Sequence, residues 1–344
     1  MAVSFDYLKR LGSGHFGEVW QAIDVGLNEE CAVKLIPKDK MIDQKNFFLE
    51  AQVLKLAEHP NIVKVIDTGL MNDERIYVKM EFLQKGSLED ETEGAYVPLS
   101  GVKKIMIDVL RGLEYAHNKN IVHRDVKPAN ILIGNANESK LSDFGLALPS
   151  IDKLDLSSIK KYQYILHLAP EVTSFDKFSF LSDIYSCGAT LYRLVNGDSF
   201  IPNLPSFEIR QKTIEGSFPD RSQYRLFIPR SFRILINKAL SVDPKNRFQS
   251  VVEMRHALER ILVEVDWEER KIPNGFMWIT NKDDMHYNIA LFENTNHKWN
   301  VRFSKGRDVR KLRVYDSLSL YNTSYYKAEI FVKKILQNFV SGKA

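Results

Sequence analysis

The sequence predicts an α+β protein with a small β-rich lobe, a larger α-helical lobe and a small C-terminal α+β domain. The first 100 residues or so contain short β-branched and aromatic runs separated by glycine or charged turns, which is typical of strands. From about Ser100 onward, apolar residues recur at helical spacing. After a charged stretch at 264–275, strand-like alternation returns and the chain closes with an amphipathic helix.

The expected elements follow this order along the chain. The first lobe is expected to hold one helix at 45–57 and strands at 5–11, 18–24, 30–36, 63–68 and 75–81. The second lobe is expected to hold helices at 102–118, 180–196, 231–240 and 250–262. The C-terminal part is expected to hold a hairpin over 287–292 and 299–303, a strand within 309–318 and a closing helix over 328–339.

These patterns set the predicted boundaries. The N-terminal lobe is expected over 1–83, the second lobe over 84–263, a linker over 264–275 and a small basic α+β accessory domain over 276–344.

The composition excludes several classes of protein. Of 344 residues, 44% are hydrophobic and 27% are charged, which excludes wholesale disorder. The two cysteines, Cys31 and Cys187, are too few for a disulfide framework or a cysteine-rich zinc site and favour a reducing, cytoplasmic location. No stretch approaches the roughly 18 apolar residues of a spanning helix, so no membrane partner is expected.

The charge is unevenly distributed. The net charge is +4, but from Lys271 onward 13 Lys and Arg stand against 6 Asp and Glu, which leaves −3 for the preceding part. A basic C-terminal part can bind an acidic, a phosphorylated or an RNA partner. A solvated basic face, or a face docked against the preceding lobe, is the plainer alternative.

Three glycines, Gly12, Gly14 and Gly17, lie where one predicted strand turns into the next. Such a turn brings backbone N–H groups close to phosphate oxygens, although a plain hairpin has the same pattern.

Lys34 is the one charged residue in the run Cys31-Ala32-Val33-Lys34, and Glu50 on the following helix is a candidate partner for it. By itself, Lys34 would equally suit an exposed strand edge.

The most specific pattern spans His123 to Asn130 and is followed by Asp143-Phe144-Gly145. Asp125 can accept a proton from a hydroxyl nucleophile, and Lys127 can neutralise a phosphoryl group in transfer. Asn130 and Asp143 supply oxygen ligands that suit Mg²⁺. The spacing therefore predicts phosphoryl-transfer chemistry.

With these motifs, the chain from about Tyr7 to Val263 resembles the eukaryotic-type protein kinase family, and its serine/threonine branch in particular, because Lys127 stands two positions after Asp125. The resemblance implies a bilobal protein kinase fold, ATP and Mg²⁺ as cofactors, and a protein substrate. It implies that Lys34 holds the α- and β-phosphates and pairs with Glu50, and that Asp125 and Lys127 are catalytic residues. It also implies that Asn130 and Asp143 bind the metal. It places Leu11, Gly12, Gly14, Gly17, Val19, Ala32, Met80, Glu81, Leu83 and Leu132 around the nucleotide, with Glu81 and Leu83 acting through main-chain atoms.

The same resemblance extends to the second lobe. Ala169-Pro170-Glu171 matches the motif that closes the activation segment, and Arg247 matches the arginine that pairs with its glutamate. Asp183 matches the aspartate that braces the catalytic loop. Arg124 before Asp125 implies activation by phosphorylation of the segment between Asp143 and Glu171, with Ser157 or Ser158 as the favoured acceptor.

One stretch departs from the family. Gln163 to Leu168 lacks the usual Gly-Thr pair, and Tyr164 stands where a threonine is expected. The expected function is transfer of the γ-phosphoryl group of ATP to Ser/Thr hydroxyls of proteins, with autophosphorylation. The departure leaves a dual-specificity or tyrosine-directed kinase, or a nucleotide-binding pseudokinase scaffold, as alternatives. The basic C-terminal part leaves a further alternative, a nucleic-acid-binding module with the kinase as its regulated partner.

Overall fold

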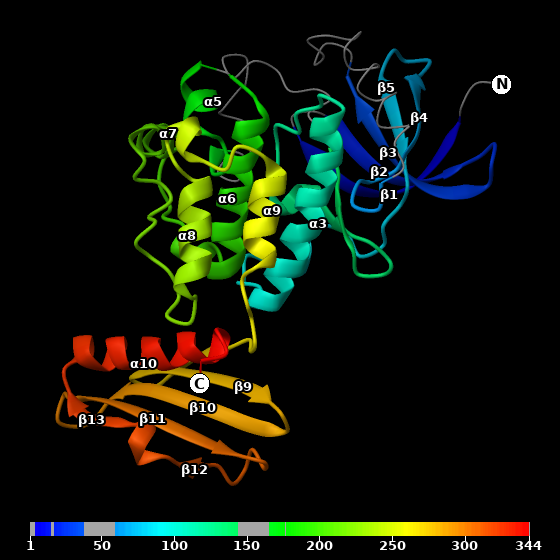
Figure 1. Cartoon of the computed structure of the whole chain (residues 1–344). Helices are drawn as coiled ribbons and strands as arrows, with labels where there is room; N and C mark the ends of the chain where they lie inside the picture. The colour runs from blue at the N-terminus through cyan, green and yellow to red at the C-terminus, as the bar shows by residue number, and fades with distance from the viewer. Residues whose placement is uncertain (1–3, 15–16, 38–58, 144–164, 176, 344) are drawn as a thin grey trace.

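The computed structural model describes residues 4–14, 17–37, 59–143, 165–175 and 177–343. Figure 1 shows a strand-rich lobe beside a helical lobe, with a helix-backed sheet below the helical lobe. The α+β, two-lobed architecture with a C-terminal β-rich region is therefore confirmed.

The N-terminal lobe contains a five-stranded antiparallel sheet in the order β1-β2-β3-β5-β4. Its strands are β1 (Phe5–Gly14), β2 (Gly17–Asp24), β3 (Glu29–Ile36), β4 (Val65–Leu70) and β5 (Ile76–Met80). Side chains of β3 alternate between two cores, as the period of two in a strand requires. Cys31, Val33 and Leu35 pack in a cluster on one face, whereas Ala32 and Ile36 join the main core on the other. Lys34 shares its face with Ala32, which directs it toward the second lobe.

The second lobe is built around α6 (Phe180–Asn196), which is buried from Ser182 to its end. Ser179 and Ser182 cap its N-terminus reciprocally, which fixes where the helix begins. The remaining elements are α2 (Leu88–Thr92), α3 (Leu99–Asn118), η2 (Pro128–Asn130), β6 (Ile131–Ile133), β7 (Ser139–Leu141), α5 (Pro170–Phe175), η4 (Asp198–Phe200), α7 (Ser206–Glu215), α8 (Arg230–Ala239), η5 (Pro244–Asn246) and α9 (Val251–Glu259). Among the described residues, no helix is both long enough and apolar enough to cross a bilayer.

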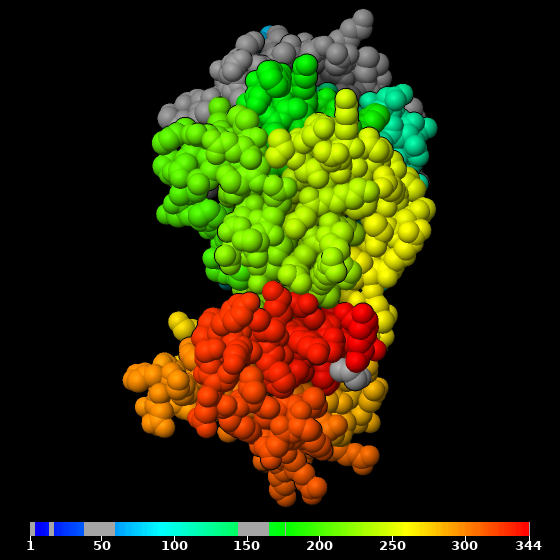
Figure 2. All heavy atoms as spheres, turned by 60° about the vertical axis from the view of Figure 1, so that its left-hand side comes forward, coloured from blue at the N-terminus to red at the C-terminus, as the bar shows by residue number. Residues whose placement is uncertain are grey.

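The C-terminal region is a sheet in the order β12-β11-β10-β9-β8, with β13 also paired to β11. Its elements are β8 (Glu268–Ile272), β9 (Gly275–Lys282), β10 (Met285–Glu293), β11 (Trp299–Gly306), β12 (Arg313–Val314), η6 (Asp316–Leu318), β13 (Leu320–Thr323) and α10 (Tyr325–Val340). Phe339 of α10 packs on Tyr287 and Phe303 of the sheet, with ring centroids 5.1 and 5.9 Å apart. Figures 1 and 2 show α10 lying between the helical lobe and this sheet.

Polar contacts hold the C-terminal region against the second lobe. The hydroxyl of Tyr96 accepts a hydrogen bond from Glu269 N at 2.7 Å and donates to Trp267 O at 3.3 Å. The Glu269 carboxylate pairs with Arg225 and accepts from Trp278 Nε1 at 2.8 Å. Because the Arg225 and Glu269 side chains are only 13% and 15% exposed, this pair lies inside the interface and fixes how the two parts meet.

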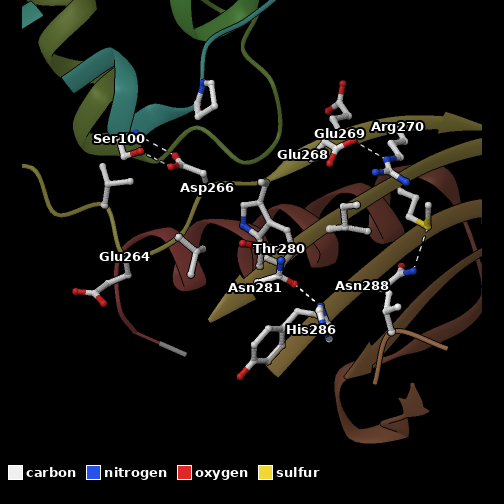
Figure 3. Close-up of a pocket in the computed structure, with 18 of the residues that line it drawn as sticks. Ser100, Glu264, Asp266, Glu268, Glu269, Arg270, Thr280, Asn281, His286 and Asn288 are labelled. Atoms are coloured by element: carbon white, nitrogen blue, oxygen red, sulfur yellow. Dashed lines mark hydrogen bonds and ion pairs between the residues drawn. The ribbon is translucent and has the colours of Figure 1, made fainter. Parts of the chain in front are cut away.

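A second contact involves the N-terminus of α3. Pro98 stands at the cap position and supplies no side-chain hydrogen bond, but Ser100 N donates to Asp266 Oδ1 at 2.9 Å, and the Ser100 hydroxyl also donates to this carboxylate. Figure 3 shows this contact at the wall of a cavity of about 1170 Å³ between the second lobe and the C-terminal sheet. Asp266 therefore caps α3 from a position far along the chain.

Two sequence expectations for the C-terminal region need correction. The range 264–275, expected as a linker, contains β8, an edge strand of the C-terminal sheet. Charged residues such as Glu268 and Arg270 are common on edge strands, which is why the segment looks like a linker in sequence. Within 309–318 only Arg313–Val314 forms a strand, because Asp308 folds a turn by accepting from Arg310 N and the chain then enters η6.

Candidate active site

The glycine-rich turn joins β1 and β2. Gly14 and Gly17 face each other across the hairpin, and Gly17 has a φ of +122°. A Cβ atom on Gly17 would lie 1.9 Å from Leu35 O, so only glycine fits at this position. Gly12 has open space around its Cα, which leaves room for a ligand to approach the backbone.

Lys34 reaches from β3 across the gap between the lobes. Its Nζ lies 2.9 Å from Asp143 Oδ1, and the Lys34 side chain is 11% exposed. Burial opposes ionisation of Asp143, but attraction by Lys34, its hydrogen bond and the charge of Lys127 together lower the pKa of Asp143. The expected partner, Glu50, lies outside the described residues, so the Lys34–Glu50 pair stays a prediction.

Asp125 is held by two neighbours from the same loop. Lys127 Nζ lies 2.7 Å from Asp125 Oδ2, and Asn130 Nδ2 donates to Asp125 Oδ2 and Asp125 O at 2.8 Å each. Among the described residues, Asp125 Oδ1 has no hydrogen-bond partner. One carboxylate oxygen is thus fixed and the other can accept a proton from a hydroxyl group.

Asp183 braces this loop from the buried helix α6. Its carboxylate accepts from His123 N and Arg124 N at 2.8 Å each, and lies 2.8 Å from His117 Nε2. Arg124 has a φ of 72°, a conformation that costs free energy in a non-glycine residue and needs such support. The sequence prediction that Asp183 holds the loop is confirmed.

His123 connects the loop to the strand segment that carries Asp143. His123 Nε2 lies 3.0 Å from Ser142 O, and Asp125 N donates to His123 Nδ1 at 3.3 Å. The ring is fully buried, and this burial lowers the pKa of His123, so the imidazole is neutral at neutral pH. Ser142 N also donates to Asn130 O at 2.9 Å, which places Asn130 beside Asp143.

The predicted adenine walls come from both lobes. Val19 lies opposite Lys34 in the sheet, and Ala32 lies opposite Met80. Ala32 and Met80 are each 8% exposed, and Leu132 is partly buried against the same core. Leu11, at the start of the glycine turn, is exposed.

The segment after β5 joins the two lobes. The N–H of Leu83 has no hydrogen-bond partner among the described residues. The Glu81 carboxylate, for which the sequence predicted no role, accepts from Lys64 N at 2.8 Å and from Lys140 Nζ at 2.9 and 3.1 Å. Glu81 therefore ties the connection between the lobes to β7, a long-range contact that no motif signals.

The glutamate that closes the activation-segment motif is anchored in the second lobe. Both terminal nitrogens of Arg247 donate to Glu171, at 2.7 Å each, and Arg247 is fully buried. The predicted Arg247–Glu171 pair is confirmed. In the unusual stretch before it, Ile165 and Leu166 pack with Ile209 and Phe218, so these apolar residues form a small core of their own.

The predicted Mg²⁺ site requires oxygen atoms that make no other hydrogen bond. Asn130 uses its Nδ2 as a donor, which leaves Oδ1 without a partner, and Asp143 Oδ2 is likewise without one among the described residues. Two such oxygens suit Mg²⁺, which takes few protein ligands and keeps water and phosphate oxygens as the others. Phe144, Gly145, Ser157, Ser158 and Tyr164 lie outside the described residues.

Comparison with known proteins agrees with this geometry. Residues 5–260 match the protein kinase domain model. The chain belongs to the protein kinase domain family. The bonded pairs Lys34–Asp143 and Asn130–Asp125 thus lie within a kinase domain.

The relatives are bacterial kinases. The chain is 35% identical over 265 residues to the serine/threonine-protein kinase PknB of Mycobacterium leprae, and 33% identical over 265 residues to PknB of Mycolicibacterium smegmatis. It is 29% identical over 255 residues to the serine/threonine-protein kinase PrkC of Bacillus subtilis. These alignments cover 73% of this chain but only 42%, 42% and 39% of the relatives, so the chain spans about two fifths of the kinases that it matches.

Proposed function

We propose that this protein is a serine/threonine protein kinase that transfers the γ-phosphoryl group of ATP to hydroxyl groups of protein substrates, including its own. The single observation that carries the proposal is the convergence of two bonded groups, Lys34–Asp143 and Lys127–Asp125–Asn130, between the lobes. The names of the bacterial relatives support it.

In this proposal each residue acts on a different atom. Asp125 Oδ1 accepts the proton of the attacking hydroxyl, while Lys127 and Asn130 hold the other oxygen and orient the carboxylate. The new bond forms between the hydroxyl oxygen and the γ-phosphorus as the bond to the ADP oxygen breaks. Lys34 and Lys127 supply positive charge to the phosphate oxygens in a partly buried site, where charge stabilisation is stronger than in water.

The nucleotide and metal assignments belong to the same proposal. Asn130 Oδ1 and Asp143 Oδ2 would hold Mg²⁺, which neutralises phosphate charge when bound. The glycine turn would cover the phosphates, and the N–H of Leu83 with the walls Val19, Ala32 and Leu132 would receive adenine. Glu50 keeps its predicted role as the partner of Lys34. Ser157 or Ser158 remains the predicted site of activating phosphorylation.

We also propose roles for the C-terminal region. Residues 264–343 would form an accessory domain that binds an acidic, phosphorylated or RNA partner, a role supported by the excess of basic residues after Lys271. The two free, buried thiols Cys31 and Cys187 support a reducing, cytoplasmic location.

The test is phosphate transfer by the purified chain. Radiolabelled ATP, Mg²⁺ and a generic acceptor protein are incubated with the wild type, with Asp125→Asn, and with Asp6→Asn as a matched control on the exposed surface of β1. We expect Asp125→Asn to lose about 10²- to 10⁴-fold in rate and the control to lose nothing. Wild-type turnover in Asp125→Asn would refute the assigned roles.

Two further measurements separate the alternatives. Identification of the labelled residue type distinguishes a serine/threonine kinase from a tyrosine-directed or dual-specificity enzyme. ATP binding without labelled product in the wild type would instead identify a pseudokinase scaffold. A Lys34→Met variant, with exposed Lys9→Met as its control, tests the phosphate contact, because loss of this charge should abolish transfer while the fold remains.

A further inference from the structure

The outer edge of the C-terminal sheet, residues 305–326, is largely exposed, and we name it the basic edge. It runs from the β11–β12 hairpin through β12, η6 and β13 to the start of α10. Figure 1 places β13 at the end of the sheet beside the start of α10, and β12 on the side of the sheet that faces away from both lobes. Figure 2 shows this part projecting below the rest of the molecule. A partner can therefore reach the basic edge without displacing either lobe.

The basic edge carries cations that the protein does not neutralise. Its basic residues are Lys305, Arg307, Arg310, Lys311 and Arg313, and all but Lys305 are exposed. None of them lies within 4.0 Å of a carboxylate oxygen among the described residues. The two acidic residues nearby are engaged locally, because Asp308 accepts from Arg310 N at 2.9 Å and Asp316 accepts from the Tyr321 hydroxyl at 3.1 Å.

Three exposed aromatic rings follow these cations along the same edge. Tyr315, Tyr321 and Tyr326 are 36%, 44% and 69% exposed. Lys305 Nζ lies 4.7 Å from the centroid of the Tyr315 ring, so one cation and one ring already form a pair. Single-stranded nucleic acid can stack its bases on exposed rings and place its phosphates on nearby cations, so this edge offers both kinds of contact.

We propose that the basic edge binds single-stranded RNA. Charge alone would also suit an acidic protein, but acidic side chains gain little from exposed aromatic faces, whereas unstacked bases stack on them. Duplex RNA keeps its bases stacked on one another and would leave the three tyrosines unused. Exposed Ser317, Asn322 and Ser324 on the same edge offer hydrogen bonds to 2′-hydroxyl groups, which favours RNA over DNA.

This inference rests on the proposed partner-binding role of the C-terminal region and is independent of the proposed phosphoryl transfer. Binding to the full-length chain is measured by fluorescence anisotropy with a labelled 20-nucleotide RNA of mixed sequence, without ATP. If all five cations contact phosphates, the logarithm of the binding constant should fall with the logarithm of salt concentration with a slope of about −3.5. Asp125→Asn should bind equally well, so a failure of the kinase assignment leaves this result unaffected.

Two variants with matched controls locate the site. Arg310→Glu, Lys311→Glu and Arg313→Glu together should weaken binding about tenfold or more. The same charge change at exposed positions elsewhere, Lys104→Glu, Lys245→Glu and Lys271→Glu, should have a much smaller effect. Melting curves of both triple variants confirm that the fold is kept.

The tyrosines are tested in the same way. Tyr321→Ala with Tyr326→Ala should weaken RNA binding about fivefold or more, whereas Phe175→Ala with Phe207→Ala, two rings that are each 71% exposed elsewhere, should not.

Three results would overturn the proposal. One is no RNA binding at physiological salt, and another is RNA binding that the charge variant and its control weaken equally. The third is polyglutamate binding as tight as RNA binding with no effect of the tyrosine variant, which would identify an acidic protein as the partner. Single-stranded DNA of the same sequence should bind more weakly than the RNA, and duplex RNA of that sequence should bind more weakly still.

Discussion

Replacing Glu171 by Gln tests how the end of the activation segment is held. Arg247 presents two nitrogens to Glu171 at 2.7 Å each, and its side chain is 0% exposed. The Arg247 guanidinium also donates to Leu181 O and Ser241 O at 2.8 Å each. The variant keeps the size of the side chain and removes only the negative charge, so it isolates the ion pair.

The expected loss follows from the burial of Arg247. Breaking a buried pair from one side costs about 3–5 kcal/mol because the remaining charge is left without compensation. The carbonyl contacts of Arg247 survive, which places the loss near the lower value. At about 2–4 °C per kcal/mol for a domain of this size, the melting temperature should fall by roughly 6–12 °C.

Thermal unfolding followed by circular dichroism measures this loss, with Glu268→Gln as the control. The Glu268–Arg270 pair has an N–O distance of 2.6 Å, but its side chains are 57% and 52% exposed. Water screens this pair, so the control should melt with the wild type. Equal shifts in the two variants would refute the argument that burial, and not distance, sets the strength of the Glu171–Arg247 pair.

Three other outcomes are expected. Asp266→Ala should lower the free energy of unfolding by about 1 kcal/mol, measured by urea titration, because Ser100 N at the start of α3 loses its acceptor. The hydrogen bond from Lys79 lowers the pKa of Asp24 despite burial. The ionised Asp24 carboxylate therefore contributes fully to the free energy of unfolding above about pH 4, and this contribution is lost as the pH falls further. The stability difference between the wild type and Asp24→Asn should shrink below that pH. Trp267→Ala should cost about 3–5 kcal/mol, seen as early unfolding of the C-terminal region in hydrogen exchange, because the 2% exposed indole packs against α10.

The sequence predicted the site best where its residues are close together in the chain. Asp125, Lys127 and Asn130 lie within one loop, and their order fixes which groups can meet after a short turn. The glycine turn is also close together in sequence, because Gly14 and Gly17 face each other across one hairpin, although the atom that excludes a Cβ at Gly17 belongs to Leu35 on β3. Motif spacing was therefore sufficient for these residues.

Contacts between distant segments were harder to predict. Lys34 and Asp143 are separated by 109 residues. The resemblance placed both residues at the nucleotide, but it did not predict the direct bond between them. The Glu81–Lys140 contact and the Ser100–Asp266 cap lie 59 and 166 residues apart and carry no motif. Such pairs depend on how lobes pack, which local pattern does not encode.

The sequence by itself determined the two-lobed α+β class and the loop chemistry around Asp125, because strand and helix periods and motif spacing are local properties of the chain. Only the tertiary structure decided that β8 belongs to the C-terminal sheet and that the Arg225–Glu269 pair fixes this sheet against the helical lobe. The sequence of a charged edge strand resembles that of a linker, because the strand is stabilised by backbone hydrogen bonds to a neighbouring strand. That pairing exists only in the folded protein.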